Sequence, residues 1–116
     1  MANNPELQAK LDLLLNSYCL QLPHRQKEID GLWQLVCQQQ KMGDEGRELH
    51  RLVHSLAGSG ASFGFAALSE TAKSFELLLK ECCDGDLVMD SARQLLMEQE
   101  RVRLYEALNR FSEESV

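Results

Sequence analysis

The chain is poor in residues that interrupt helices or favour strands. Its 116 residues include two prolines, Pro5 and Pro23, and its β-branched residues are five valines, one isoleucine and one threonine. Leu, Glu, Gln, Lys, Arg and Ala dominate instead, and all of these are good helix formers. No segment shows the period-two alternation of a half-buried strand. The sequence therefore predicts an all-α protein.

The sequence also lacks long apolar runs, an excess of basic residues and paired cysteine motifs. Its apolar stretches are too short to cross a membrane, and the start, MANNPELQAK, has no apolar core of a signal peptide, so we expect a cytoplasmic protein. The net charge of −6 argues against nucleic acid as a partner, because phosphate binding needs a basic surface. The four cysteines, Cys19, Cys37, Cys82 and Cys83, show no C-x-x-C spacing, so we expect reduced thiols.

Helical patterns begin at the N-terminus, and the length suits one domain, residues 1–116, with one core. Asn4 is the expected cap, and Pro5 the expected first residue, of a helix that continues to residue 22. Pro23 then either begins a second helix over residues 23–40 or kinks one long helix. The segment after Pro23 carries an apolar stripe at helical spacing, formed by Ile29, Leu32, Trp33, Val36 and Cys37.

Further helices are expected after the break KMGDEG. Asp44 is the expected cap of one that ends near Ser62, and Gly64 is expected to turn the chain into another over residues 65–83. A bent helix, or two short ones, should span residues 88–111 before a frayed acidic end. Short links favour an antiparallel up-down-up-down four-helix bundle with an additional N-terminal helix.

Apolar residues of these later helices mark the expected core. The core residues expected on the two helices around Gly64 are Leu56, Phe63, Phe65, Leu68, Ala72, Phe75 and Leu79. The last segment has two apolar faces, one with Ala92, Leu95 and Val102 and the other with Leu104, Leu108 and Phe111. Its stripe therefore drifts around the helix.

One short run, HSLAGSGASFGF at residues 54–65, holds three of the chain's seven glycines within a helical pattern. The apolar stripe of this helix is formed by Leu49, Leu52, Val53 and Leu56. His54 falls roughly 140–150° from the centre of that stripe, on the solvent side, and Gly58 lies one turn beyond it. Glycine inside a helix costs about 1 kcal/mol relative to alanine. An exposed glycine beside a histidine therefore indicates clearance for a partner or a phosphoryl group.

The surroundings of His54 suggest what this clearance serves. Its own face should be lined by Arg47, His50, Arg51, Ala57, Gly58 and Ala61. Ten residues separate His54 from Gly64, so the next helix should bring Lys73, Glu76 and Lys80 to the same level. An imidazole that is nucleophilic when neutral, with open space and nearby cations, is typical of a transient phosphoryl carrier.

The run H-S-L-A-G-S-G-A-S-F-G-F-A-A-L, with Ala72 and Phe75–Glu76 after it, resembles the histidine-containing phosphotransfer (HPt) domain over roughly residues 22–80. The family pattern is His-x-Leu-Lys-Gly-Ser, a Gly-hydrophobic turn, and Leu-Glu or similar on the next helix. The resemblance implies that His54 is phosphorylated and that Gly58 admits the partner's active site. Glu76 matches the family's acidic or amide position, and Lys80 a basic position that faces the histidine. Where the family usually has lysine, this chain has Ala57, so Lys73, Lys80 or Arg51 would balance the phosphoryl charge.

The resemblance also implies a role and partners. The chain would be a phosphorelay intermediate, not an enzyme, that takes a phosphoryl group from an aspartyl-phosphate onto Nε2 of His54 and passes it to another aspartate. Its partners would be receiver domains of hybrid sensor histidine kinases and of response regulators. Mg²⁺ would be bound by the receiver, with no cofactor on this chain, which we expect to be a monomer.

Three other interpretations compete with a phosphoryl carrier. A non-catalytic helical adaptor that sequesters receiver domains would present the same surface without accepting phosphate. A histidine kinase would need an ATP-binding domain, which 116 helical residues do not supply, and generally has an acidic residue where Ser55 stands. A metal site at His50 and His54 would lack the glutamate of H-E-x-x-H, because Arg51 stands there, and has no evident third ligand. We therefore expect no metal.

Overall fold

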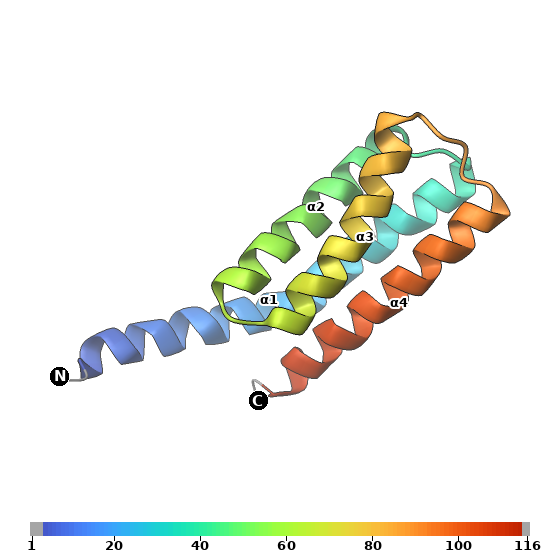
Figure 1. Cartoon of the computed structure of the whole chain (residues 1–116). Helices are drawn as coiled ribbons and strands as arrows, with labels where there is room; N and C mark the ends of the chain where they lie inside the picture. The colour runs from blue at the N-terminus through green and yellow to red at the C-terminus, as the bar shows by residue number, and fades with distance from the viewer. Residues whose placement is uncertain (1–3, 115–116) are drawn as a thin grey trace.

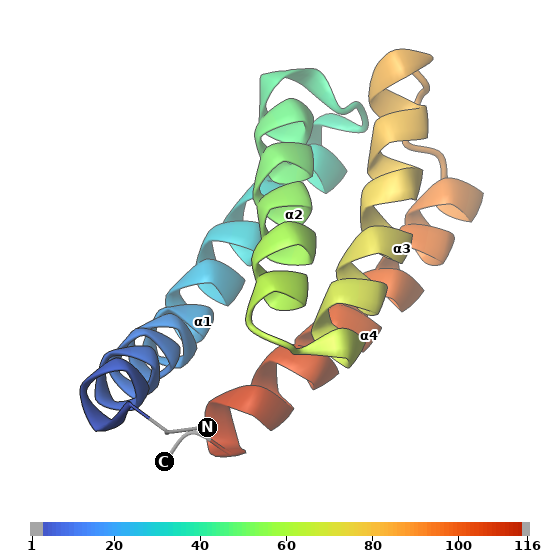
Figure 2. The same ribbon diagram turned by 60° about the vertical axis from the view of Figure 1, so that its left-hand side comes forward.

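The computed structural model of the chain describes residues 4–114, with side chains for residues 4–110, and consists there of four α-helices (Figure 1). Helix α1 spans Pro5–Gln39, α2 Gly43–Ser62, α3 Ala66–Asp84 and α4 Ser91–Glu114. Residues 4–114 contain no β-strand, only an isolated antiparallel bridge between Lys41 and Val88. Successive helices run in opposite directions, each packs against the next, and α4 packs back against α1 (Figures 1 and 2). The predicted all-α, up-down-up-down bundle is therefore observed.

The expected additional N-terminal helix is not found, because one helix, α1, continues through Pro23. Its start is as predicted: the Asn4 side chain accepts hydrogen bonds from two backbone N–H groups of the first turn. Proline inside a helix removes one backbone hydrogen bond and disfavours the preceding turn. Buried Leu22 and Ile29, one on each side of Pro23, fix both halves of α1 to the bundle, and this packing offsets the cost. The N-terminal turns of α1 project beyond the other helices (Figure 1).

The core fills the space between the four helices, and most of the predicted core residues lie in it. Trp33 of α1 meets Phe75 of α3 edge-on, with ring centroids 6.1 Å apart. Leu56, Leu68, Ala72 and Leu79 are buried as predicted. Phe63 and Phe65 are only half-buried, because the ring on which they stack, Tyr18 of α1, is itself half-buried; the ring-centroid distances are 4.4 and 5.8 Å. These rings cover the end of the core.

The ends of α2 differ in how well the sequence predicts them. The predicted Asp44 cap is wrong: α2 begins at Gly43 after Met42, which is buried, and Asp44 lies in the first turn. The predicted turn at Gly64 is observed, with φ at +83°, where glycine is favoured. There the backbone N–H of Phe65 donates to the Gly60 carbonyl at 2.7 Å, and that of Gly64 to the Ala61 carbonyl at 3.1 Å. These two bonds form a Schellman motif that ends α2.

Helix α4 is one helix, and its inward face is the second of the two predicted apolar faces. Leu104 and Leu108 are buried, whereas the first face, Ala92, Leu95 and Val102, is exposed. Charged residues share the inward face: the Arg101 guanidinium lies over the Tyr105 ring, 4.8 Å from its centroid. The prediction for the Phe111 side chain lies outside the described side chains. Helix α4 continues past residue 111 to Glu114, and the last two residues of the expected frayed end, 115–116, are outside the described range.

Replacement of Phe75 by alanine tests the assigned core. Phe75 is fully buried, so Phe75→Ala should lower the free energy of unfolding by about 3–5 kcal/mol, measured by urea denaturation. Leu77→Ala is the control, because Leu77 is 67% exposed on the same helix, and its effect should stay within about 0.5 kcal/mol. A loss below about 1 kcal/mol for Phe75→Ala would show that α3 buries a different face.

Candidate functional site

His54 projects from the middle of α2 into solvent, and its ring is held by one carboxylate of α3. The side chain is 69% exposed, and Nδ1 lies 2.5 Å from Oε1 of Glu76, which is 18% exposed. A carboxylate only accepts hydrogen bonds, so Nδ1–H of His54 donates to Glu76. In the neutral ring this proton position leaves the lone pair on Nε2. The contact matches the level of Glu76 that the sequence predicts.

His50, one turn before His54, approaches the same carboxylate oxygen. Its Nε2 lies 3.6 Å from Oε1 of Glu76. The two imidazole rings are nearly parallel, with centroids 6.1 Å apart and an interplanar angle of 22°. Nε2 of His50 is buried and makes no hydrogen bond to any described residue. One carboxylate therefore faces two histidines.

Two glycines near His54 have different surroundings. A Cβ added at Gly58 would meet no atom within 4 Å, so the expected clearance one turn from His54 is present. A Cβ at Gly60 would lie 3.3 Å from the backbone nitrogen of Ser69 on α3. Gly60 and Ser69, neither of which was predicted as a site residue, therefore set the close approach of α2 to α3. The phase of the apolar stripe on α2 indicates the inward position of Gly60, seven residues after Val53.

The expectation that Ala57 lines the exposed face is wrong. Ala57 is only 3% exposed, and its carbonyl accepts a hydrogen bond of 2.8 Å from Oγ of Ser69. It lies on the edge of α2 that packs against α3, one turn after the buried Val53. Alanine suits both a surface and a close helix contact, so its residue type gave no warning.

The cations around His54 fall into two groups. Arg47 and Arg51 are exposed on α2, but each binds a carboxylate three residues earlier, Asp44 and Glu48. The hydrogen bonds that the guanidinium groups donate to these carboxylates raise the pKa of both arginines. On α3, Lys73 and Lys80 lie one turn before and one turn after Glu76, are exposed, and make no ion pair within residues 4–110. Of the predicted cations, the α3 lysines are those free to meet an anion.

A shallow hollow of about 330 Å³ lies near the α2–α3 turn. It is lined by Ala61, Gly64, Ala66, Ser69, Glu70 and Lys73. Ala61 follows His54 by seven residues, or about two helical turns, so the hollow lies along the same side of α2. The exposed position predicted for Ala61 is observed.

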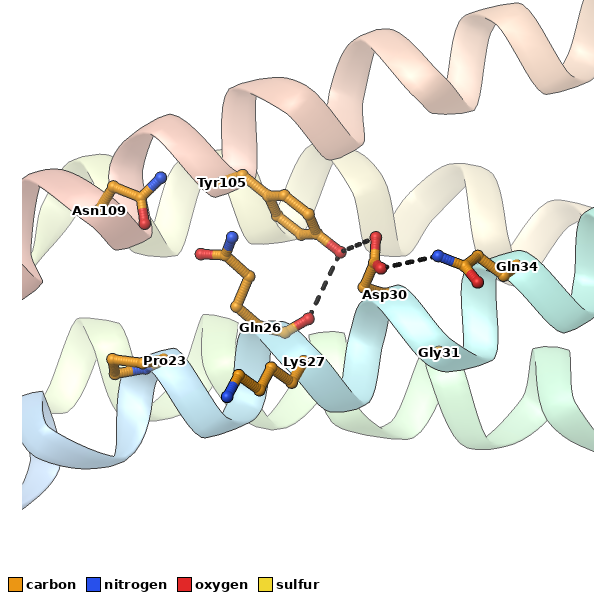
Figure 3. Close-up of a pocket in the computed structure, with 8 residues that line it drawn as sticks. All are labelled: Pro23, Gln26, Lys27, Asp30, Gly31, Gln34, Tyr105 and Asn109. Carbon is orange, nitrogen blue, oxygen red and sulfur yellow. Dashed lines mark hydrogen bonds between the residues drawn. The ribbon is translucent and has the colours of Figure 1, made fainter.

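A second groove lies elsewhere, between α1 and α4 (Figure 3). Its polar centre is Tyr105, whose hydroxyl donates to Oδ1 of Asp30 at 3.4 Å. Burial raises the pKa of Tyr105 to about 12, so the phenol stays protonated at neutral pH. No predicted site residue lines this groove.

The cysteines show no feature of a reactive site. All four are free thiols. Burial raises the pKa of Cys37, Cys82 and Cys83, which keeps these thiols protonated at neutral pH and lowers their nucleophilicity. Within the described side chains, no group of three or more His, Cys, Asp or Glu residues is placed to hold a metal ion. Among the helices of residues 4–114, none has the length and apolar character needed to cross a membrane.

Comparison with known proteins gives a family match. The sequence model of the family described as Hpt domain matches residues 5–112. This range includes α1, α2, α3 and most of α4, with His54 and Glu76. Searches of curated proteins and of solved structures gave no match.

The two glycines offer a matched pair of substitutions. Gly58→Ala should raise the free energy of unfolding by up to about 1 kcal/mol, because alanine is the better helix former and the space is open. Gly60→Ala has the same gain in helix propensity, but its Cβ would lie 3.3 Å from the backbone nitrogen of Ser69, closer than an ordinary van der Waals contact, so it should be less stable than Gly58→Ala by about 1–3 kcal/mol. Urea denaturation measures both. Equal stabilisation by the two changes would show that Gly60 does not set the distance between the helices.

Proposed function

Since this chain belongs to the Hpt domain family, whose members are phosphocarrier modules of two-component signalling, we propose that it is a phosphorelay intermediate with His54 as the phosphoacceptor. The observation that carries this proposal is the exposed His54 ring, fixed by Glu76 through Nδ1, with open space at Gly58. The donor is an aspartyl-phosphate of one receiver domain, and the acceptor is the aspartate of another. The family's phosphocarrier role needs no kinase or ATP-binding domain on the carrier.

The transfer step follows from the state of the His54 ring. The lone pair on Nε2 attacks phosphorus, a P–N bond forms, and the P–O bond to the receiver's aspartate breaks, which returns that carboxylate to the receiver. The ring keeps its proton on Nδ1 and becomes positively charged. The Glu76 carboxylate, 2.5 Å from Nδ1, stabilises this charge as it develops. Transfer to the second receiver is the same step in reverse.

The rest of the site positions a partner and its charge. Gly58 and Ala61 leave room for the receiver surface along α2. Lys73 and Lys80 supply positive charge on the α3 side of His54, where Ala57 supplies none. The receiver contributes Mg²⁺ and its acidic pocket, so this chain needs only to orient the nucleophile. Buried Ala57 is not part of this surface.

The proposed partners set the remaining expectations. They are receiver domains of hybrid sensor histidine kinases and of response regulators, so the proposal places the protein in the cytoplasm. The carrier acts as a monomer that presents one surface to each receiver in turn. An adaptor that only sequesters receivers would use the same surface, and the labelling experiment below separates the two.

Replacement of His54 tests the proposal directly. A receiver domain carrying a labelled aspartyl-phosphate should transfer the label to the wild-type chain, and the product should be acid-labile and base-stable, as expected for a phosphohistidine. His54→Gln should fold normally and accept no label. His50→Gln should still be labelled, at His54, and His24→Gln is the control at an exposed histidine of α1. Undiminished labelling of His54→Gln would disprove the assignment, and receiver binding without label on the wild type would favour the adaptor.

A second test concerns the clearance at Gly58. Gly58→Gln places a long side chain one turn from His54, and we expect the transfer rate to fall about 10–100-fold because the receiver is displaced. Gly58→Ala should reduce it less. Gly31→Gln is a matched control, because Gly31 of α1 is also an exposed helical glycine with open space and lies away from His54. Unfolding curves should show no loss of stability in any of the three. An unchanged rate for Gly58→Gln would show that the glycine is incidental.

A further inference from the structure

We infer that His50 is a positioning residue for His54 and acts through the carboxylate that both histidines face, that of Glu76. The inference rests on the proposed function of His54 and adds a residue to it. Oε1 of Glu76 accepts a hydrogen bond from Nδ1–H of His54 at 2.5 Å and lies 3.6 Å from Nε2 of His50. A single oxygen atom of Glu76 therefore lies close to both imidazole rings, hydrogen-bonded to His54 and in a longer contact with His50.

Burial makes the second contact significant. His50 is 28% exposed and Glu76 is 18% exposed, compared with 69% for His54. Nε2 of His50 is buried without a hydrogen-bond partner among the described residues, and the carboxylate oxygen of Glu76 is what it faces. A buried polar atom gains from such an acceptor, since an unsatisfied one is costly.

Other charges around the two rings do not replace Glu76. On α2, Arg47 and Arg51 are bound to Asp44 and Glu48. On α3, Lys73 and Lys80 flank Glu76 and carry the same sign as an imidazolium. On α1, the other helix packed against α2, Glu28 is bound by His24 and Arg25. Glu76 is therefore the one carboxylate in contact with either ring among the described side chains.

The positions of the two rings and of Glu76 predict the direction in which His50 affects protonation of His54. A proton on His50 attracts Glu76 and repels a second proton on His54, because the ring centroids are only 6.1 Å apart. Because His54 attacks phosphorus only when its ring is neutral, His50 keeps His54 competent to a lower pH than Glu76 alone would allow. Removal of His50 should therefore move the acid limb of the transfer reaction to higher pH.

Titration of the histidine ring signals by NMR tests the coupling without any phosphoryl transfer. In His50→Gln, the midpoint of the His54 curve should rise by about 0.5–1 pH unit, the size expected from a charge 6.1 Å away in largely hydrated surroundings. His50→Lys keeps a positive charge beside Glu76 at every pH, so its His54 midpoint should be no higher than that of the wild type. Glu76→Gln should lower it, and His24→Gln, on α1, should leave it in place.

The outcomes separate this inference from the proposed function. Initial rates of transfer from a phosphorylated receiver, measured against pH, should show an acid limb shifted upward in His50→Gln by the same amount as the NMR midpoint. A His54 curve that moves by less than about 0.2 unit in His50→Gln would overturn the coupling, even if His54 is phosphorylated. A lower rate at every pH without a shift would show that His50 only packs. A shifted NMR curve in a chain that accepts no phosphate would overturn the proposed function, and the role of His50 in transfer with it.

Discussion

The close approach of α2 and α3 is the constraint on which the site depends. Gly60 lets the backbone of α2 lie against Ser69, and Oγ of Ser69 donates to the Ala57 carbonyl, so distance and register are both fixed at one level. Glu76 follows Ser69 by seven residues, about two turns of α3. The register set at Ser69 therefore places the Glu76 carboxylate against Nδ1 of His54. A helix pair held further apart would break the contact between Glu76 and Nδ1 of His54, and the position of Nε2, the nucleophile of the proposed function, would no longer be defined.

The glycine-rich run thus places two glycines, Gly58 and Gly60, on two different faces of α2, with different surroundings. Gly60 faces inward, where a Cβ would lie closer to the α3 backbone than an ordinary van der Waals contact, and Gly58 faces outward, where a Cβ would meet no atom within 4 Å. Gly60 therefore allows the helices to pack closely, whereas Gly58 makes no contribution to packing. Because helical glycine lowers stability, the proposed function accounts for the outward glycine by the receiver that approaches His54. The hollow beside Ala61 is also open to solvent and lies further along α2 from His54, so under the proposed function it too leaves room for the receiver.

Much of this was predictable, and the errors have physical reasons. Strong periodicity in the central helices correctly placed most of the core, and the count from Gly64 placed Glu76 near the level of His54, where the two side chains are in contact. The sequence did not decide whether Pro23 begins a second helix or lies within one long helix. The cost of a helical proline is local, whereas the packing that offsets it is tertiary. Ala57 was placed on the wrong face because alanine suits either environment. The apolar pattern of α4 offered two faces and no choice between them. Arg101 lies on the inward face with its charge satisfied by Glu98, and the periodicity of apolar residues does not register such a side chain.

Exposure decreases steadily across the site, and this gradient suits a carrier that meets two partners. The side chain of His54 is 69% exposed, that of His50 28% and that of Glu76 18%, and all three residues lie within helices α2 and α3. The reacting ring can therefore be reached by a donor and later by an acceptor without any rearrangement of this chain. The Glu76 carboxylate is only 18% exposed, and under the proposed function its effect on His54 would be the same in each encounter. Under the proposed function, the transfer is reversible, so the carrier must not favour one direction by a movement of its own. The direction of transfer is then set by the receiver that docks at Gly58.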